Sequence, residues 1–206
     1  MSRIFYVIIS SMEPVKTKAQ SFWELVRFVA LVLIIVLPIR WFVFSSYVVS
    51  GSSMIPTFQN GNYLIIDKIS YKLNNPKRDD VVVFRYPNDT TKFYIKRIIG
   101  LPGETINVKS RENKITIVNQ EHPDGFQLDQ PFVKNIGGID AHLTLKNDEY
   151  FVMGDNRSGS SDSRYWGAVK RNLLTGRALL RLRLWPINNL VEVLPGNYKQ
   201  INEQRK

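Results

Sequence analysis

The sequence predicts a mostly β domain held by a single N-terminal membrane-spanning helix. The segment Phe28–Val49 contains one charged residue, Arg40, in 22 residues. As a helix it would be about 33 Å long, which matches a bilayer hydrocarbon core of about 30 Å. Runs of β-branched and aromatic residues follow it, separated by proline and glycine turns, and this pattern is typical of strands. No long amphipathic helix follows the apolar segment.

The composition limits the chemistry that the chain can carry. A hydrophobic fraction of 44% with 12% aromatic residues is too rich for a disordered protein. The chain has no cysteine, which excludes disulfides, thiol nucleophiles and cysteine-bound zinc. Its two histidines, His122 and His142, do not form a His-x-x-x-His pair. We therefore expect no metal and no cofactor, and any hydrolytic reaction would use Ser, Thr, Lys, Asp, Glu or Tyr.

Residues 22–49 are expected to form the membrane anchor. Trp23 lies near one end of this segment, and Trp41 and Tyr47 lie towards the other, as in the aromatic belts of membrane interfaces. A cleaved secretory signal is the alternative interpretation, because it also combines a charged start with an apolar middle. No Ala-x-Ala sequence follows the apolar run, so a retained anchor is favoured.

The charges before the anchor predict its orientation. Residues 1–21 contain three basic residues and few acidic ones, namely Arg3, Lys16 and Lys18 against Glu13. Segments with an excess of Lys and Arg tend to stay on the cytoplasmic side. We therefore expect residues 1–21 in the cytoplasm and the bulk of the chain outside.

The exterior domain, residues 50–194, is expected to be one open or barrel-like β assembly. Four runs of strand length carry β-branched and aromatic residues: Val81–Phe84, Phe93–Gly100, Lys114–Val118 and Tyr150–Gly154. In Arg177–Trp185 leucine and arginine alternate with a period of two, which predicts a half-buried strand. Residues 195–206 are predicted to be a loose polar tail.

Three stretches have residues that could carry chemistry. Ser53 lies in Ser50–Phe58, where Gly51 and Pro56 predict a turn directly after the anchor. Lys96 shares one face of a predicted strand with Tyr94 and Ile98, and an apolar face would lower the pKa of its amine. Met153–Gly167 is a dense polar run after a strand. Taken singly, the three are equally well explained as a serine-rich linker, a surface lysine and a polar turn.

Together the three stretches resemble one family. SSMIPT, GNYLIIDKISY (Gly61–Tyr71), YIKRIIGLPGE and GDNRSGSSDSRYWG occur in the order and wording of the type I signal peptidases, with the YWG ending of the bacterial members. The similarity runs from the anchor to Gly167. It implies a signal-peptidase-type β fold of antiparallel sheets, with a minimal second β region between Glu104 and Tyr150.

The resemblance assigns three catalytic residues. Ser53 would be the nucleophile, Lys96 the general base, and Ser160 the hydroxyl that positions the lysine amine. The chemistry agrees with these roles, because a serine hydroxyl needs an adjacent base before it can attack an acyl carbon. A neutral lysine can accept that proton and later return it to the leaving amine.

The resemblance also assigns residues around the dyad. Met54 and Ile95 would line a small apolar pocket that admits alanine before the cut. Four charged residues would brace the site: Arg97, Asp155, Asp162 and Arg164. Some family members have a hydroxyl residue two positions before the nucleophile, where it helps to bind the oxyanion. This chain has Gly51 there, so the backbone N–H of Ser53 would carry more of that role.

The expected function is therefore a membrane-bound serine endopeptidase of the bacterial plasma membrane. It would remove signal peptides from exported preproteins after small residues (Ala-x-Ala). The net charge of +10 is dispersed, which favours anionic lipid headgroups over nucleic acid as a partner, and the protein-export channel is a further candidate. The alternatives are a specialised pilin-processing or organellar peptidase, and an inactive tethered β domain that binds exported proteins. A soluble self-cleaving repressor would need a DNA-binding motif that this chain lacks.

Overall fold

The structure is a computed structural model that describes residues 17–38, 43–131, 133, 137–182 and 191–193. The chain divides into two compact units, Met1–Trp41 and Phe42–Lys206, which we describe separately. The expected polar tail and the first 16 residues lie outside the described residues, as does the end of the strand expected at Arg177–Trp185.

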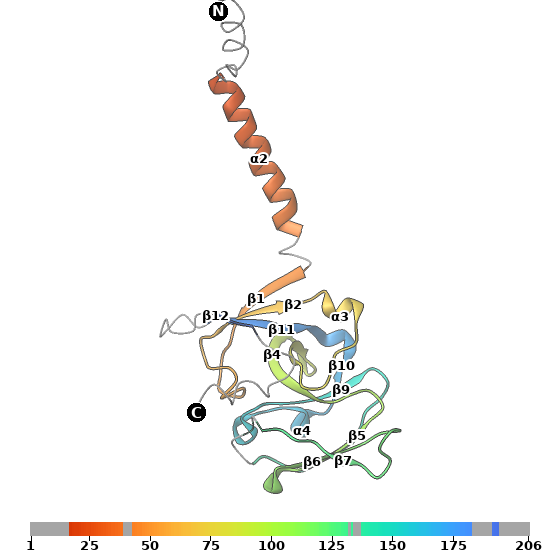
Figure 1. The fold of residues 1–206 in the computed structure, drawn as a ribbon. Coiled ribbons are helices and arrows are strands. Elements are labelled where there is room, and N and C mark those ends of the chain that lie inside the picture. The colour runs from red at the N-terminus through yellow and green to blue at the C-terminus, as the bar shows by residue number, and fades with distance from the viewer. Residues whose placement is uncertain (1–16, 39–42, 132, 134–136, 183–190, 194–206) are drawn as a thin grey trace, which may run out of the picture. The chain divides into compact units, whose positions relative to one another are not determined.

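The first unit contains helix α2, Lys18–Pro38 (Figure 1). It has 21 residues with a mean hydropathy of 2.1 in its most apolar window, so its length and composition suffice to cross a membrane. None of its residues is buried within the structure. Pro38 is its last residue, and a proline cannot donate the hydrogen bond of a continuing helix.

The expectation of one helix from Phe28 to Val49 is wrong in its second half. Phe44–Val48 forms strand β1, which pairs antiparallel with β2, Tyr63–Asp67, from Phe44↔Asp67 to Val48↔Tyr63. Tyr47 packs against the core of the second unit. Hydropathy alone does not distinguish a strand of this kind from the end of a membrane helix.

The larger sheet of the second unit is antiparallel throughout. Its order is β1-β2-β11-β3-β4-β9-β10, with β12 beside β11. The strands not yet given are β3 (Val81–Tyr86), β4 (Asp89–Gly100), β9 (Glu149–Met153), β10 (Val169–Lys170), β11 (Leu174–Leu182) and β12 (Val191–Val193).

A four-stranded antiparallel sheet follows β4 and confirms the second β region expected between Glu104 and Tyr150. Its order is β7-β6-β5-β8, formed by Phe126–Gln127, Lys114–Val118, Thr105–Lys109 and Ala141–Thr144. The remaining elements are short: α3 (Ser70–Leu73), α4 (Ser163–Trp166), and the 3-10 turns η2 (Ser110–Glu112), η3 (Arg157–Gly159) and η4 (Arg171–Leu173). The mostly β fold is confirmed, as two sheets rather than one assembly.

Strand β4 changes from exposed to buried along its length. Its first residues are largely exposed, whereas every residue from Lys96 to Gly100 is buried. β3 pairs with β4 through Arg97, but β9 pairs only with Arg97–Gly100. Lys96 therefore lies where β4 enters the core, beside a stretch whose second edge has no strand partner in the described sheet.

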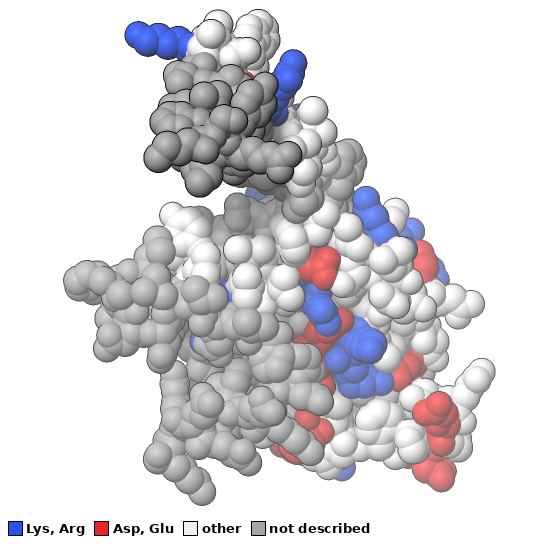
Figure 2. Space-filling view, turned by 45° about the horizontal axis from the view of Figure 1, so that its top comes forward, with Lys and Arg blue, Asp and Glu red and all other residues white. Residues whose placement is uncertain are grey.

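Charges on the visible face of the second unit are mixed. Figure 2 shows Lys and Arg side chains lying among Asp and Glu side chains rather than in one continuous basic area. Some of these form exposed ion pairs between close sequence neighbours, such as Lys92 with Asp89 and Lys109 with Glu112. Exposed pairs of this kind contribute little to stability.

Candidate active site

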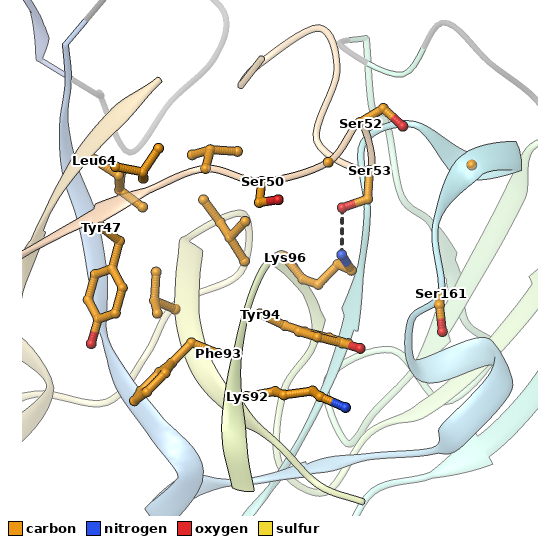
Figure 3. A pocket seen from close by; sticks show the side chains of 16 residues that line it. Tyr47, Ser50, Ser52, Ser53, Leu64, Lys92, Phe93, Tyr94, Lys96 and Ser161 are labelled. Carbon is orange, nitrogen blue, oxygen red and sulfur yellow. Dashed lines mark hydrogen bonds between the residues drawn. The ribbon is translucent and has the colours of Figure 1, made fainter. Parts of the chain in front are cut away.

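A cavity of about 510 Å³ opens in the second unit where residues 47–53 face residues 92–96 of β4 (Figure 3). Leu64, Val83, Gly159 and Ser161 complete its lining. It combines apolar walls with a few hydroxyl and amine groups, which is typical of a site that binds a peptide or a small molecule.

Ser53 projects into this cavity from the loop that follows β1. Gly51 has a φ of +101°, a conformation that favours glycine, and its N–H donates to Asn60 Oδ1 at 2.9 Å. After Ser53 the chain turns inward, and Met54 and Phe58 are both almost fully buried. The loop is thus anchored by apolar side chains while the serine hydroxyl stays at the cavity.

Lys96 Nζ lies 2.6 Å from Ser53 Oγ (Figure 3). Only 5% of the lysine is exposed. Burial disfavours the charged amine and lowers its pKa from 10.5 to about 8, although the carboxylates of Asp162 and Asp155 act in the opposite direction. Near neutral pH a substantial share of the amine is therefore unprotonated, and its lone pair can accept the proton of the serine hydroxyl.

Aromatic rings cover the lysine on its own strand. Nζ lies 5.6 Å from the centre of the Tyr94 ring, and Tyr94 stacks on Tyr86 with their ring centres 4.6 Å apart. Trp166 packs against the edge of Tyr86. These rings occupy space beside the amine that water would otherwise fill, and so they contribute to its desolvation.

Two buried ion pairs lie behind the dyad. Arg97 donates to both carboxylate oxygens of Asp155, from Nε at 2.8 Å and from Nη2 at 2.5 Å. Arg164 binds both oxygens of Asp162 at 2.8 and 2.9 Å. All four side chains are at most 1% exposed. Two-point pairs of this kind fix orientation as well as charge.

Each pair connects to the polar loop after β9. Asp162 caps α4 by accepting the N–H of Arg164, and it also accepts the N–H of Gly154 at 3.1 Å. Arg164 donates to the carbonyl oxygens of Arg157 and Gly137. The four residues expected as braces therefore lie together, and they join the loop to the strand that carries Lys96.

Ser160 lies close to the dyad without the expected contact. It is buried, and among the described residues its hydroxyl has no hydrogen-bond partner, so the bond expected from Ser160 to the Lys96 amine is not formed in this structure. Its oxygen instead packs against Gly154. Its positioning role stays a prediction.

The two expected pocket residues differ in their placement. Ile95 lines the cavity. Met54 is 1% exposed and packs in the core with Phe58 and Leu64, so it supports the wall from behind rather than forming the described lining. A residue next to the nucleophile can point inward because the loop turns there.

Sequence reasoning missed the residues that hold the nucleophile loop against the loop after β9. The Asn156 N–H donates to the Ser53 carbonyl at 3.0 Å, and its side-chain amide donates to the Ser52 carbonyl at 3.2 Å. Thr57 donates to Asp155 at 2.5 Å. Asn156 and Thr57 both lie within the motifs quoted above, but no periodicity links positions about 100 residues apart.

Comparison with known proteins gives consistent matches. A family model described as "Signal peptidase, peptidase S26" matches residues 22–185. A "Probable signal peptidase I-2" of Synechocystis sp. is 37% identical over 171 residues, covering 80% of this chain and 73% of that protein. "Signal peptidase I V" of Bacillus subtilis is 37% identical over 172 residues, covering 76% and 95%. A crystal structure of a signal peptidase I from Enterococcus faecalis V583 aligns with 50% of this chain and 97% of that chain, at 30% identity and a TM-score of 0.42.

Replacing Gly154 by alanine should disrupt the site. A Cβ there would lie 2.5 Å from the Ser53 carbonyl oxygen and closer still to the Ser160 hydroxyl. Because a displacement of about 1 Å at a reacting group can cost about 10²-fold in rate, we expect a loss of that order in cleavage of a model preprotein. Gly103→Ala is the control, since Gly103 has a φ of +81° but open space around it. Equal losses in both variants would contradict the prediction.

Proposed function

The chain belongs to the signal peptidases of peptidase family S26, and on that basis we propose that Ser53 and Lys96 carry out its cleavage of signal peptides from preproteins. The single observation that carries the assignment is the 2.6 Å contact between Ser53 Oγ and the buried Lys96 Nζ. A hydroxyl beside a base is the arrangement that nucleophilic catalysis requires.

The reaction follows from this pair. Ser53 Oγ attacks the carbonyl carbon of the scissile bond while the neutral Lys96 amine accepts the hydroxyl proton. The resulting ammonium gives that proton to the leaving amine as the C–N bond breaks, which leaves the signal peptide esterified to Ser53. Lys96 then takes a proton from water, the hydroxide attacks the ester, and the proton returns to Ser53 Oγ.

The backbone N–H of Ser53 is the proposed main donor to the oxyanion. It donates no hydrogen bond to any described residue, so it is available to the substrate. Gly51 offers no side-chain hydroxyl, and its N–H is already bound to Asn60. Donors of this kind stabilise the transition state because they are oriented before the reaction begins.

The cavity suits an extended peptide with small side chains near the cut. Ile95, Leu64 and Val83 provide apolar walls beside the dyad. Their contact with a small apolar side chain supports cleavage after Ala-x-Ala sequences. Met54 would act through the core behind this wall.

Helix α2 is consistent with a membrane anchor. The proposed orientation, with residues 1–21 in the cytoplasm and the catalytic domain outside a bacterial plasma membrane, rests on the basic residues before the helix. Anionic lipid headgroups are proposed partners of the dispersed basic side chains. The export channel is a proposed neighbour, because preproteins reach the outer face through it.

The test of this function is cleavage of a model preprotein whose signal ends in Ala-x-Ala, with the products identified by mass spectrometry. The detergent-solubilised full chain should cut after the final alanine, and Ser53→Ala should show no cleavage above background. Ser46→Ala is the matched control, because Ser46 is exposed on β1 and should leave the rate unchanged. Cleavage that survives in Ser53→Ala would reject the proposed nucleophile.

The cleavage rate should rise with pH. Because the pKa of Lys96 is lowered to about 8, the amine is mostly protonated at lower pH and cannot accept the serine proton. We expect the single-turnover rate to increase by about tenfold per pH unit below that value and to level off above it. A profile that is flat from about pH 6 to 9 would show that a lysine base does not limit the reaction.

A further inference from the structure

Thr57 makes a buried polar contact that the dyad mechanism does not use. It lies in the same loop as Ser53, four residues further along, and is 7% exposed. Its hydroxyl donates to Asp155 Oδ2 at 2.5 Å. A buried hydroxyl bound to a carboxylate is a strong, charge-assisted hydrogen bond.

Asp155 connects this hydroxyl to the strand of the proposed base. The same Oδ2 accepts from Arg97 Nη2 at 2.5 Å, and Arg97 Nη2 lies 3.4 Å from Thr57 Oγ1. Arg97 follows Lys96 directly in β4, and it also binds the Asp79 carbonyl at 2.9 Å. Thr57, Asp155 and Arg97 therefore form a closed buried network.

Each member of the network comes from a segment that carries one proposed catalytic residue. Thr57 belongs to the Ser53 loop, Arg97 to the Lys96 strand, and Asp155 to the loop that contains Ser160. The apolar side chains that anchor the Ser53 loop, Met54 and Phe58, give burial but no directional bond. The hydroxyl of Thr57 supplies a directional side-chain bond between that loop and the strand network.

We propose that Thr57 is a positioning residue whose hydroxyl holds the Ser53 loop at hydrogen-bonding distance from Lys96. This inference rests on the catalytic roles of Ser53 and Lys96 given under Proposed function. Thr57 itself does not line the described cavity, so it acts on the reaction through the loop. Its loss should lower the rate of the chemical step without weakening substrate binding.

Removing the hydroxyl should leave the fold intact. Without Thr57, Asp155 would still accept two hydrogen bonds from Arg97, so the buried carboxylate would keep its charge partner. Valine has nearly the shape of threonine and would fill the same space. The effect of Thr57→Val is therefore expected on the position of the loop more than on stability.

The experiment compares Thr57→Val with Thr57→Ser in the detergent-solubilised full chain, on the Ala-x-Ala preprotein. Thr57→Val should lower kcat by about tenfold or more, since displacements of about 1 Å can cost about 10²-fold, with KM changed by less than about twofold. Thr57→Ser keeps the hydroxyl and should stay within about threefold of the unmodified chain. Thr105→Val is the matched control: it removes a Thr105–Thr144 contact of 2.9 Å in the small sheet and should leave kcat unchanged.

Thermal unfolding of each variant separates positioning from folding, and Thr57→Ala replaces Thr57→Val if the latter does not fold. A kcat loss below tenfold, a loss that appears in KM instead, or an equal loss in Thr57→Ser would overturn the proposal. Ser53→Ala measured in the same assay distinguishes this failure from failure of the proposed function. If Ser53→Ala is inactive while Thr57→Val is fully active, the dyad stands and the positioning role does not.

Discussion

Burial of the Lys96 amine beside the Ser53 hydroxyl is the constraint on which the rest of the site depends. A lysine exposed to water would be almost fully protonated near neutral pH and could not accept a proton. β4 resolves this by entering the core at Lys96 while its preceding residues remain exposed. The amine is thus desolvated, yet it faces a cavity that is open to a peptide.

The charges around the dyad oppose this desolvation and must be controlled. The carboxylates of Asp155 and Asp162 favour the protonated amine, but each is bound at two points by an arginine. The pairing compensates these buried negative charges and limits their effect on Lys96. The same arginines tie the loop after β9 to the rest of the domain, so electrostatic control and mechanical support come from one set of residues.

Local patterns predicted the strands around the site, and the quoted motifs predicted its central residues. The four strand runs were found because their β-branched composition is a local property, and Ser53 and Lys96 were found because they lie in motifs specific enough to identify a family. The second half of the expected anchor was wrong because β1 pairs with β2, a contact that hydropathy does not record. Likewise, the inward direction of Met54 and the loop contacts of Thr57 and Asn156 depend on packing between distant segments.

The central claim is that the folded chain holds an unusually acidic lysine at position 96, and nuclear magnetic resonance can measure this directly. The full chain in detergent micelles, labelled with ¹³C and ¹⁵N in lysine only, would be titrated while the side-chain signals are followed. A Lys96→Arg sample identifies the signal by its loss. The account predicts a midpoint near pH 8 for Lys96. A midpoint near the ordinary value of 10.5 would contradict it, because the amine would then be solvated and protonated under the conditions in which it must act as a base.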